Sequence, residues 1–111
     1  MSKKITEQDI IDSVASACQY ISFYHPEDFV QGMVEAYEAE QSESAKNAIG
    51  QILINSKMCA MGHRPLCQDT GSVNIFVKVG LKANLELTKE LIDVLNEGVA
   101  KGYTDPDNTL R

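Results

Sequence analysis

The sequence has little of several residue types on which particular classes of protein depend. It contains no tryptophan, three prolines and three cysteines in 111 residues. The cysteines, Cys18, Cys59 and Cys67, form no Cys-x-x-Cys pair, so neither a disulfide framework nor a complete metal site is predicted. No apolar run approaches the roughly 20 residues that a membrane-spanning helix needs, and Met1 is not followed by a signal-peptide core. We therefore expect a cytoplasmic location and no membrane partner.

Positive charge is scarce in the N-terminal part of the chain. The formal net charge is −6, and residues 1–45 carry nine acidic but only two basic side chains. A nucleic-acid-binding protein of this size usually has the opposite sign, so no nucleic-acid partner is expected. The segment from Lys57 to Lys82 differs, because it holds four cations against Asp69 alone. An anionic small molecule would be better tolerated there than near the N-terminus.

Hydrophobic periodicity predicts three helices in the N-terminal half of the chain. The first covers residues 6–24 with Thr6 as its cap, and the second begins at Pro26. The third lies between a polar turn at Gln41–Glu43 and Gly62, which is expected to terminate it. The third helix should bury an apolar stripe of Ala45, Ala48, Ile49, Ile52, Leu53 and Cys59.

The pattern changes after Gly62. Residues 63–72 have no helical period and are predicted to form a loop, and the alternation of Val73, Ile75, Val77 and Val79 with other residues predicts a strand ending at Gly80. A fourth helix is expected over residues 86–100, closed by Gly102. A single strand cannot satisfy its backbone alone, so its neighbours are expected in sequence outside this chain or in another subunit.

The loop contains a thiol, an amide, a carboxylate and a hydroxyl in four consecutive positions, Cys67 to Thr70. Pro65 precedes them and Gly71 follows, and the loop joins a helix to a strand, where ligand-binding groups are often presented. On its chemistry alone, Cys67 could be a soft metal ligand, a nucleophile or a buried small residue. The polar neighbours make the third role less favourable here.

These residues resemble a known family signature. Pro65-Leu66-Cys67-Gln68-Asp69-Thr70-Gly71 is similar to the Pro-x-Cys-Gln-Asp-Thr-Gly motif of the iron–sulfur-dependent (class I) fumarate hydratases and the related tartrate dehydratase α-subunits. The resemblance extends over essentially the whole chain, including Ile21–Pro26, Ala45–Cys59 and the closing Gly102–Arg111.

The resemblance implies a role for four residues. Cys67 would be one of three cysteine ligands of a [4Fe–4S] cluster, whose fourth iron site stays open for substrate. Gln68 would contact substrate, and Asp69 would contact it and act as a catalytic proton donor or orienting group. Asn108-Thr109-Leu110-Arg111 matches a family segment in which the arginine binds a substrate carboxylate, so this role falls to Arg111.

The same resemblance implies a fold and a reaction. Residues 1–111 would be the N-terminal part of a larger α/β catalytic domain, itself α+β and mostly helical, with three helices, a loop, one strand and a fourth helix. The enzyme would hydrate fumarate reversibly to (S)-malate. Its partners would be this dicarboxylate, the rest of the catalytic domain with a C-terminal domain, and a second copy in a homodimer.

The resemblance leaves part of the active site unaccounted for, and other functions are possible alternatives. The other two cluster cysteines would lie beyond Arg111, because Cys18 and Cys59 fall on apolar helix faces and are expected in the core. The catalytic base would also lie outside this chain, so the 111 residues alone should be inactive. A tartrate dehydratase α-type subunit, a non-catalytic helical interaction module and thiol redox sensing by Cys67 are the alternatives.

Overall fold

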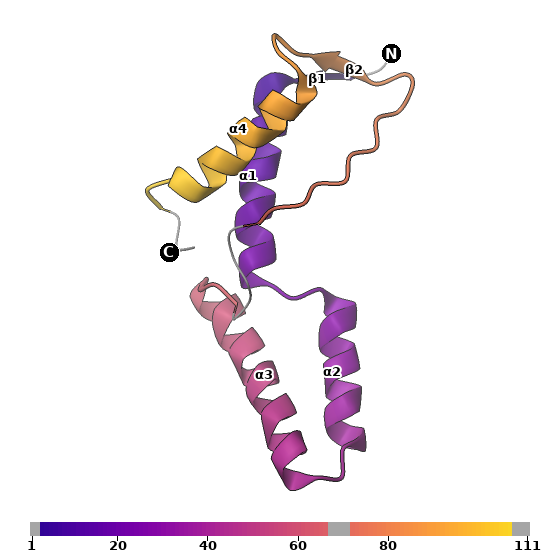
Figure 1. Ribbon diagram of the computed structural model, residues 1–111, viewed down its shortest axis with the longest axis vertical. Coiled ribbons are helices and arrows are strands. Elements are labelled where there is room, and N and C mark those ends of the chain that lie inside the picture. The colour runs from indigo at the N-terminus through magenta and orange to yellow at the C-terminus, as the bar shows by residue number, and fades with distance from the viewer. Residues whose placement is uncertain (1–2, 67–71, 108–111) are drawn as a thin grey trace. The chain divides into compact units, whose positions relative to one another are not determined.

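A computed structural model describes residues 3–66 and 72–107 of the chain (Figure 1). Most of these residues are helical, and two short strands form a parallel sheet, which confirms the α+β class. The described residues divide into a sheet unit, residues 3–19 and 72–107, and a hairpin unit, residues 20–66. Within the described ranges, no helix combines the length and the apolarity that crossing a membrane requires.

The sheet unit is built on strands β1 (Lys4–Thr6) and β2 (Asn84–Glu86). They pair in parallel with Ile5 opposite Leu85, and an ion pair of 3.0 Å joins Lys4 Nζ to Glu86 Oε1. Sequence analysis predicted neither strand, because three residues are too few to show a two-residue period. The sheet brings together segments that lie 80 residues apart in the chain.

Helix α1 (Glu7–Phe23) begins directly after β1. The Asp9 backbone N–H donates to Thr6 Oγ1 at 3.1 Å, and the Thr6 N–H donates to Asp9 Oδ2 at 3.0 Å. This reciprocal pair satisfies two backbone donors that the first helical turn leaves without partners. The predicted cap at Thr6 is confirmed. The hydrogen bonds from Thr6 also hold the pKa of the Asp9 carboxyl below its usual value.

Helix α4 (Leu91–Thr104) packs on α1 through two glycines, Gly98 and Gly102. A Cβ atom at position 98 would lie 2.7 Å from Val14 Cβ, and one at position 102 would lie 3.1 Å from the Ala15 carbonyl oxygen. The missing side chains therefore permit the close approach of the two helix backbones. Val94 on the same α4 face is completely buried.

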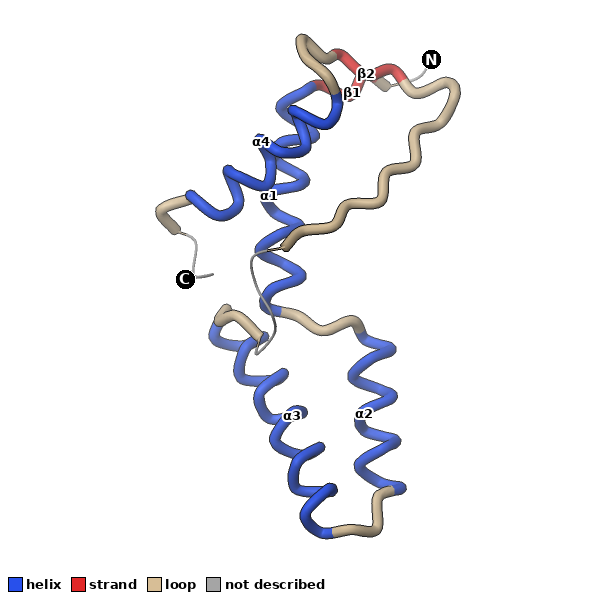
Figure 2. Tube along the Cα trace, in the orientation of Figure 1, coloured by secondary structure: helices blue, strands red, loops and turns tan. Residues whose placement is uncertain are grey.

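The hairpin unit consists of α2 (Glu27–Ala39) and α3 (Glu43–Gly62), which lie side by side (Figure 2). Pro26 is the N-cap of α2, with φ −57° and ψ 147°, so the helix begins at Glu27, one residue later than predicted. The Tyr37 ring packs on Gly50, and Lys46 Nζ lies 4.9 Å from the centre of the same ring. His25 Nδ1 and Ser56 Oγ share a hydrogen bond of 3.0 Å.

The predicted buried stripe of α3 is only partly correct. Cys59 is buried, but Ile52 is 43% exposed, and Ala48 is also exposed. The prediction assumed that the stripe was covered along its whole length. Among the described residues, α2 is the helix that packs beside α3, and one neighbour does not cover a stripe of this width.

Two predictions for the second half of the chain are wrong in detail. Residues 73–79 are extended, but no sheet includes them within the described ranges. The fourth helix begins at Leu91 instead of residue 86, because Glu86 belongs to β2. It also continues through Gly102, whose role is contact with α1 and not termination.

Candidate functional site

The four residues expected to form the site lie outside the described residues. Cys67, Gln68 and Asp69 fall between residues 66 and 72, and Arg111 follows residue 107. The structure does describe the segment that leads into Cys67, from the end of α3 to Leu66. The structural evidence about the site therefore comes from this segment, which sets the position of the backbone just before Cys67.

Helix α3 ends in a left-handed residue four positions before Cys67. His63 has a φ of 50°, and its backbone N–H donates to the Cys59 carbonyl oxygen. The Arg64 N–H donates to the same oxygen at 3.1 Å. His63, and not the expected Gly62, therefore reverses the chain at the helix end. Histidine adopts this conformation more readily than most non-glycine residues.

The His63 side chain is held by the end of α1. Its ring stacks on Phe23 with a centre-to-centre distance of 5.5 Å and an interplanar angle of 5°. Tyr24 Oη and His63 Nε2 share a hydrogen bond of 3.0 Å. These contacts give His63 a structural role at the end of α3. They also fix the direction in which the chain leaves α3.

A second anchor lies directly before Cys67. The Leu66 backbone N–H donates to the Ser22 carbonyl oxygen at 2.7 Å, and the Leu66 side chain is buried. The Pro65 carbonyl oxygen accepts a hydrogen bond from Cys59 Sγ at 3.4 Å. The loop thus enters its signature from a backbone position fixed by both α1 and α3. Rigid support of this kind keeps a ligand-bearing loop in register.

The two cysteines that the structure describes are both buried, each with 4% of its surface exposed. This confirms their prediction as core residues. Burial raises the pKa of the Cys18 thiol, which disfavours the thiolate that metals and electrophiles require. Across residues 3–66 and 72–107, no three His, Cys, Asp or Glu side chains converge in a way that could hold a metal ion.

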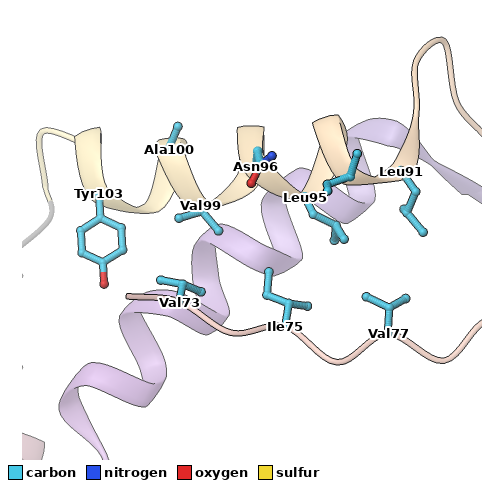
Figure 3. A pocket seen from close by; sticks show the side chains of 10 residues that line it. Val73, Ile75, Val77, Leu91, Leu95, Asn96, Val99, Ala100 and Tyr103 are labelled. Atoms are coloured by element: carbon cyan, nitrogen blue, oxygen red, sulfur yellow. The ribbon is translucent and has the colours of Figure 1, made fainter. Parts of the chain in front are cut away.

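A groove of about 780 Å³ lies in the sheet unit, between α4 and the extended residues 73–77 (Figure 3). Its lining is mainly apolar, with Asn96 and Tyr103 as the polar members. A dicarboxylate requires cationic groups or clustered N–H donors, and none of the described residues that line this groove is a cation. The described lining therefore offers the substrate that the signature implies no charged partner.

The family of this chain is identified from its sequence. A family model described as fumarate hydratase (Fumerase) matches residues 11–111, which includes the whole Cys67–Gly71 signature. The chain belongs to this family. The match also runs from residue 11, within α1, through α4 and includes both of the anchors described above, so the fumarate hydratase family relationship does not depend on the short motif.

Several curated proteins of the family are similar to this chain. A protein of Methanocaldococcus jannaschii named "Putative L(+)-tartrate dehydratase subunit alpha" is 37% identical over 92 residues, covering 83% of this chain and 32% of its own length. The L(+)-tartrate dehydratase subunit alpha of Escherichia coli K12 is 31% identical over 98 residues, covering 88% and 32%. The chain thus spans about a third of the length of these relatives. No solved structure matches it.

Sequence reasoning missed the anchors around the signature. Tyr24 and His63 lie 39 positions apart, and Ser22 and Leu66 lie 44 apart. Neither pair shows a local pattern.

Proposed function

We propose that this chain is the N-terminal part of a [4Fe–4S]-dependent hydro-lyase that interconverts fumarate and (S)-malate. The observation that carries the proposal is the family match over residues 11–111, with the complete Cys-Gln-Asp-Thr-Gly signature inside it. Because the matched relatives are about three times as long, the catalytic activity belongs to a larger protein that includes these residues.

Cys67 is proposed as one of three cysteine ligands of the cluster. One thiolate cannot hold four irons, and across residues 3–66 and 72–107 no three His, Cys, Asp or Glu side chains converge to complete the ligand set. The two remaining ligands are therefore expected from polypeptide outside this chain. When bound, such a cluster supplies an iron site without a protein ligand, which acts as a Lewis acid toward a hydroxyl group.

The residues that follow Cys67, together with Arg111, are proposed to bind and protonate the dicarboxylate substrate. Gln68 offers an amide that donates and accepts hydrogen bonds, and Asp69 offers a carboxyl that delivers or orients a proton. Arg111 can bind one substrate carboxylate through two parallel N–H···O hydrogen bonds. His63 and Leu66 support these roles indirectly, since both fix the backbone that leads into Cys67.

The test is an assay of the complete protein, with its cluster reconstituted without oxygen. Wild-type protein should hydrate fumarate, and Arg111→Lys should raise KM by about tenfold or more, because a hydrogen bond to a charged group contributes roughly 1.5–3 kcal/mol. Arg64→Lys, at an exposed arginine of the approach segment, is the matched control and should leave KM unchanged. Absence of hydration, or an unchanged KM in the Arg111 variant, would count against the proposal.

Tartrate is the second candidate substrate. The relatives named above are tartrate dehydratase α-subunits, so dehydration of L(+)-tartrate fits the names of the matched proteins. Fumarate and tartrate differ in groups at the central carbons, which the carboxylate-binding Arg111 does not distinguish. Comparison of kcat/KM for both substrates with the same reconstituted protein decides between them.

A non-catalytic helical interaction module is the alternative from another class. Its support is the exposed apolar surface of residues 73–79, which could dock on another subunit. A single monomeric species of the 111-residue chain in size-exclusion chromatography at several concentrations, with no partner bound, would argue against such a module.

A further inference from the structure

Residues 73–79 form an extended segment that pairs with no strand among the described residues. With the other described residues, this stretch makes no backbone hydrogen bond, and the nearest one joins the Ala83 N–H to the Gly80 carbonyl oxygen at 3.0 Å. Figure 2 draws the stretch as a loop along its whole length. Both edges of this segment therefore offer backbone donors and acceptors to a partner.

The side chains of the segment fit a strand and not a surface loop. Val73, Ile75 and Val77 point toward α4 and line the apolar groove there (Figure 3). Phe76 falls on the opposite face by the two-residue alternation of a strand, and it is 97% exposed. A solvated loop of this length is usually polar, whereas this segment is apolar on the face toward α4 and carries Phe76, between Asn74 and Lys78, on the other.

The segment has few of the features that protect an exposed edge. Proteins that leave an edge open usually place proline or several charges there. Between Ser72 and Gly80 there is no proline, and Lys78 is the one charged residue. Because Val73, Ile75 and Val77 already face the groove beside α4, the positions most open to a partner are the two edges and the face of Phe76.

We infer that residues 73–79 pair as a β-strand with a strand of the polypeptide that corresponds to the rest of the catalytic subunit. The matched relatives are about three times as long as this chain, so such polypeptide is available within one subunit. Pairing would bury the Phe76 side chain and give the backbone of residues 73–79 inter-strand hydrogen bonds. This inference rests on the proposed function, since that proposal makes the chain part of a larger enzyme.

Hydrogen exchange tests the inference directly. In the complete protein, backbone amides of residues 73–79 should exchange at least about 100-fold more slowly than in the 111-residue chain alone, because ladder hydrogen bonds open only with local unfolding. Equal rates in the two proteins would overturn it. So would concentration-dependent protection in the chain alone that appears together with a dimer, since a second copy would then be the partner.

A matched pair of variants tests the covered face. Phe76 and Leu81 are both fully exposed in this chain, but Leu81 lies in the turn after the segment. Phe76→Lys should lower the Tm of the complete protein and restore fast exchange at residues 73–79, whereas Leu81→Lys should change neither. Neither variant should alter the Tm of the 111-residue chain. Equal effects of both variants on the complete protein would contradict the inference.

The hydration assay on the same preparation separates the two proposals. An active protein in which residues 73–79 exchange freely would reject the strand pairing and keep the proposed function. An inactive protein in which they are protected would support the pairing while the proposed function fails.

Discussion

At the scale of single residues, helix packing depends on a glycine that lacks a side chain and on two small side chains that are buried. Gly98 lets α4 approach α1, and the two buried thiols fill space beside helices. His63 is the reverse case, because its ring contacts fix the backbone ahead of the signature. Each of these roles can be tested by one substitution or one reagent.

The Gly98→Ala substitution should destabilise the chain. The new Cβ would lie 2.7 Å from Val14 Cβ and 3.0 Å from the Ile11 carbonyl oxygen, so the helices must separate. Overpacking of this kind costs about 1–3 kcal/mol, measured as a lower urea midpoint. Gly32→Ala is the matched control, since a Cβ there meets nothing within 4 Å and replaces a helical glycine. It should stabilise the chain by about 0.5–1 kcal/mol. Equal stability of wild type and Gly98→Ala would contradict the close-packing account.

The two buried thiols should resist alkylation in the folded chain. Cys18 and Cys59 are both buried, and the raised pKa of Cys18 further reduces its thiolate fraction at neutral pH. Iodoacetamide labelling followed by mass spectrometry should therefore modify both slowly in buffer and rapidly in denaturant. Labelling of Cys18 at the same rate in both conditions would show that its helix face is not packed as described.

At the scale of elements, the sheet unit depends on the start of α1. The Thr88 backbone N–H and hydroxyl both donate to Glu7 Oε1 at 3.0 Å, so the first helical residue of α1 holds the chain just after β2. These two hydrogen bonds lower the pKa of the Glu7 carboxyl. Lys101 at the far end of α4 makes an ion pair with Asp12 of α1, and it lowers the pKa of that carboxyl as well.

Stability should therefore fall in acid. A carboxyl whose pKa is lower in the folded state contributes its full stability above its unfolded pKa, and this contribution is lost as the pH falls through the folded value. The lowered pKa values of Glu7 and Asp9 place the loss below about pH 4. Glu7→Gln should reduce stability at pH 7 and flatten the loss between pH 5 and pH 2, measured by thermal melts.

The control for this pH series is Glu38→Gln, which removes the same charge from the exposed surface of α2. It should leave the slope of stability against pH close to that of wild type. If Glu7→Gln and Glu38→Gln gave the same pH profile, the hydrogen bonds from Thr88 would not be the source of the acid sensitivity.

The elements also show which parts of the fold a single sequence can predict. The starts of helices α1 to α3 were predicted to within about one residue, because each combines apolar periodicity with a local start signal such as Thr6 or Pro26. The start of α4 was misplaced, since β2 interrupts the pattern and only pairing with β1 creates that strand. The anchors at His63 and Leu66 could not be predicted, because their partners are distant in the sequence.

At the scale of the whole molecule, the chain has a small apolar core and much exposed apolar surface. The buried apolar residues that the structure describes are Ile11, Ala15, Cys18, Phe23, Cys59, Leu66 and Val94. Large apolar side chains on α3 and on residues 73–81 are exposed, with Met61 at 76% and Phe76 at 97%. Exposed apolar surface of this extent commonly marks an interface. It accords with the proposal that these residues are part of a larger catalytic subunit.

The candidate site also has a part that the sequence could predict and a part that it could not. The Cys67–Gly71 signature was recognisable because its chemistry lies in consecutive residues, and the family match includes it. Under the proposed function, the geometry around the cluster would depend on polypeptide outside this chain, which no local pattern encodes. The roles of Gln68, Asp69 and Arg111 are therefore proposals, and the most direct test begins with the proposed metal ligand.

The decisive measurement is the iron and sulfide content of the complete protein after anaerobic reconstitution, with Cys67→Ser compared against Cys59→Ala. Cys59 is a buried thiol eight positions from Cys67, so its variant controls for the loss of a nearby cysteine. We predict about four irons per subunit, with cluster absorbance, in the wild type and in Cys59→Ala, and loss of both in Cys67→Ser. A cluster that persists in Cys67→Ser, or that is absent from the wild type, would contradict the account.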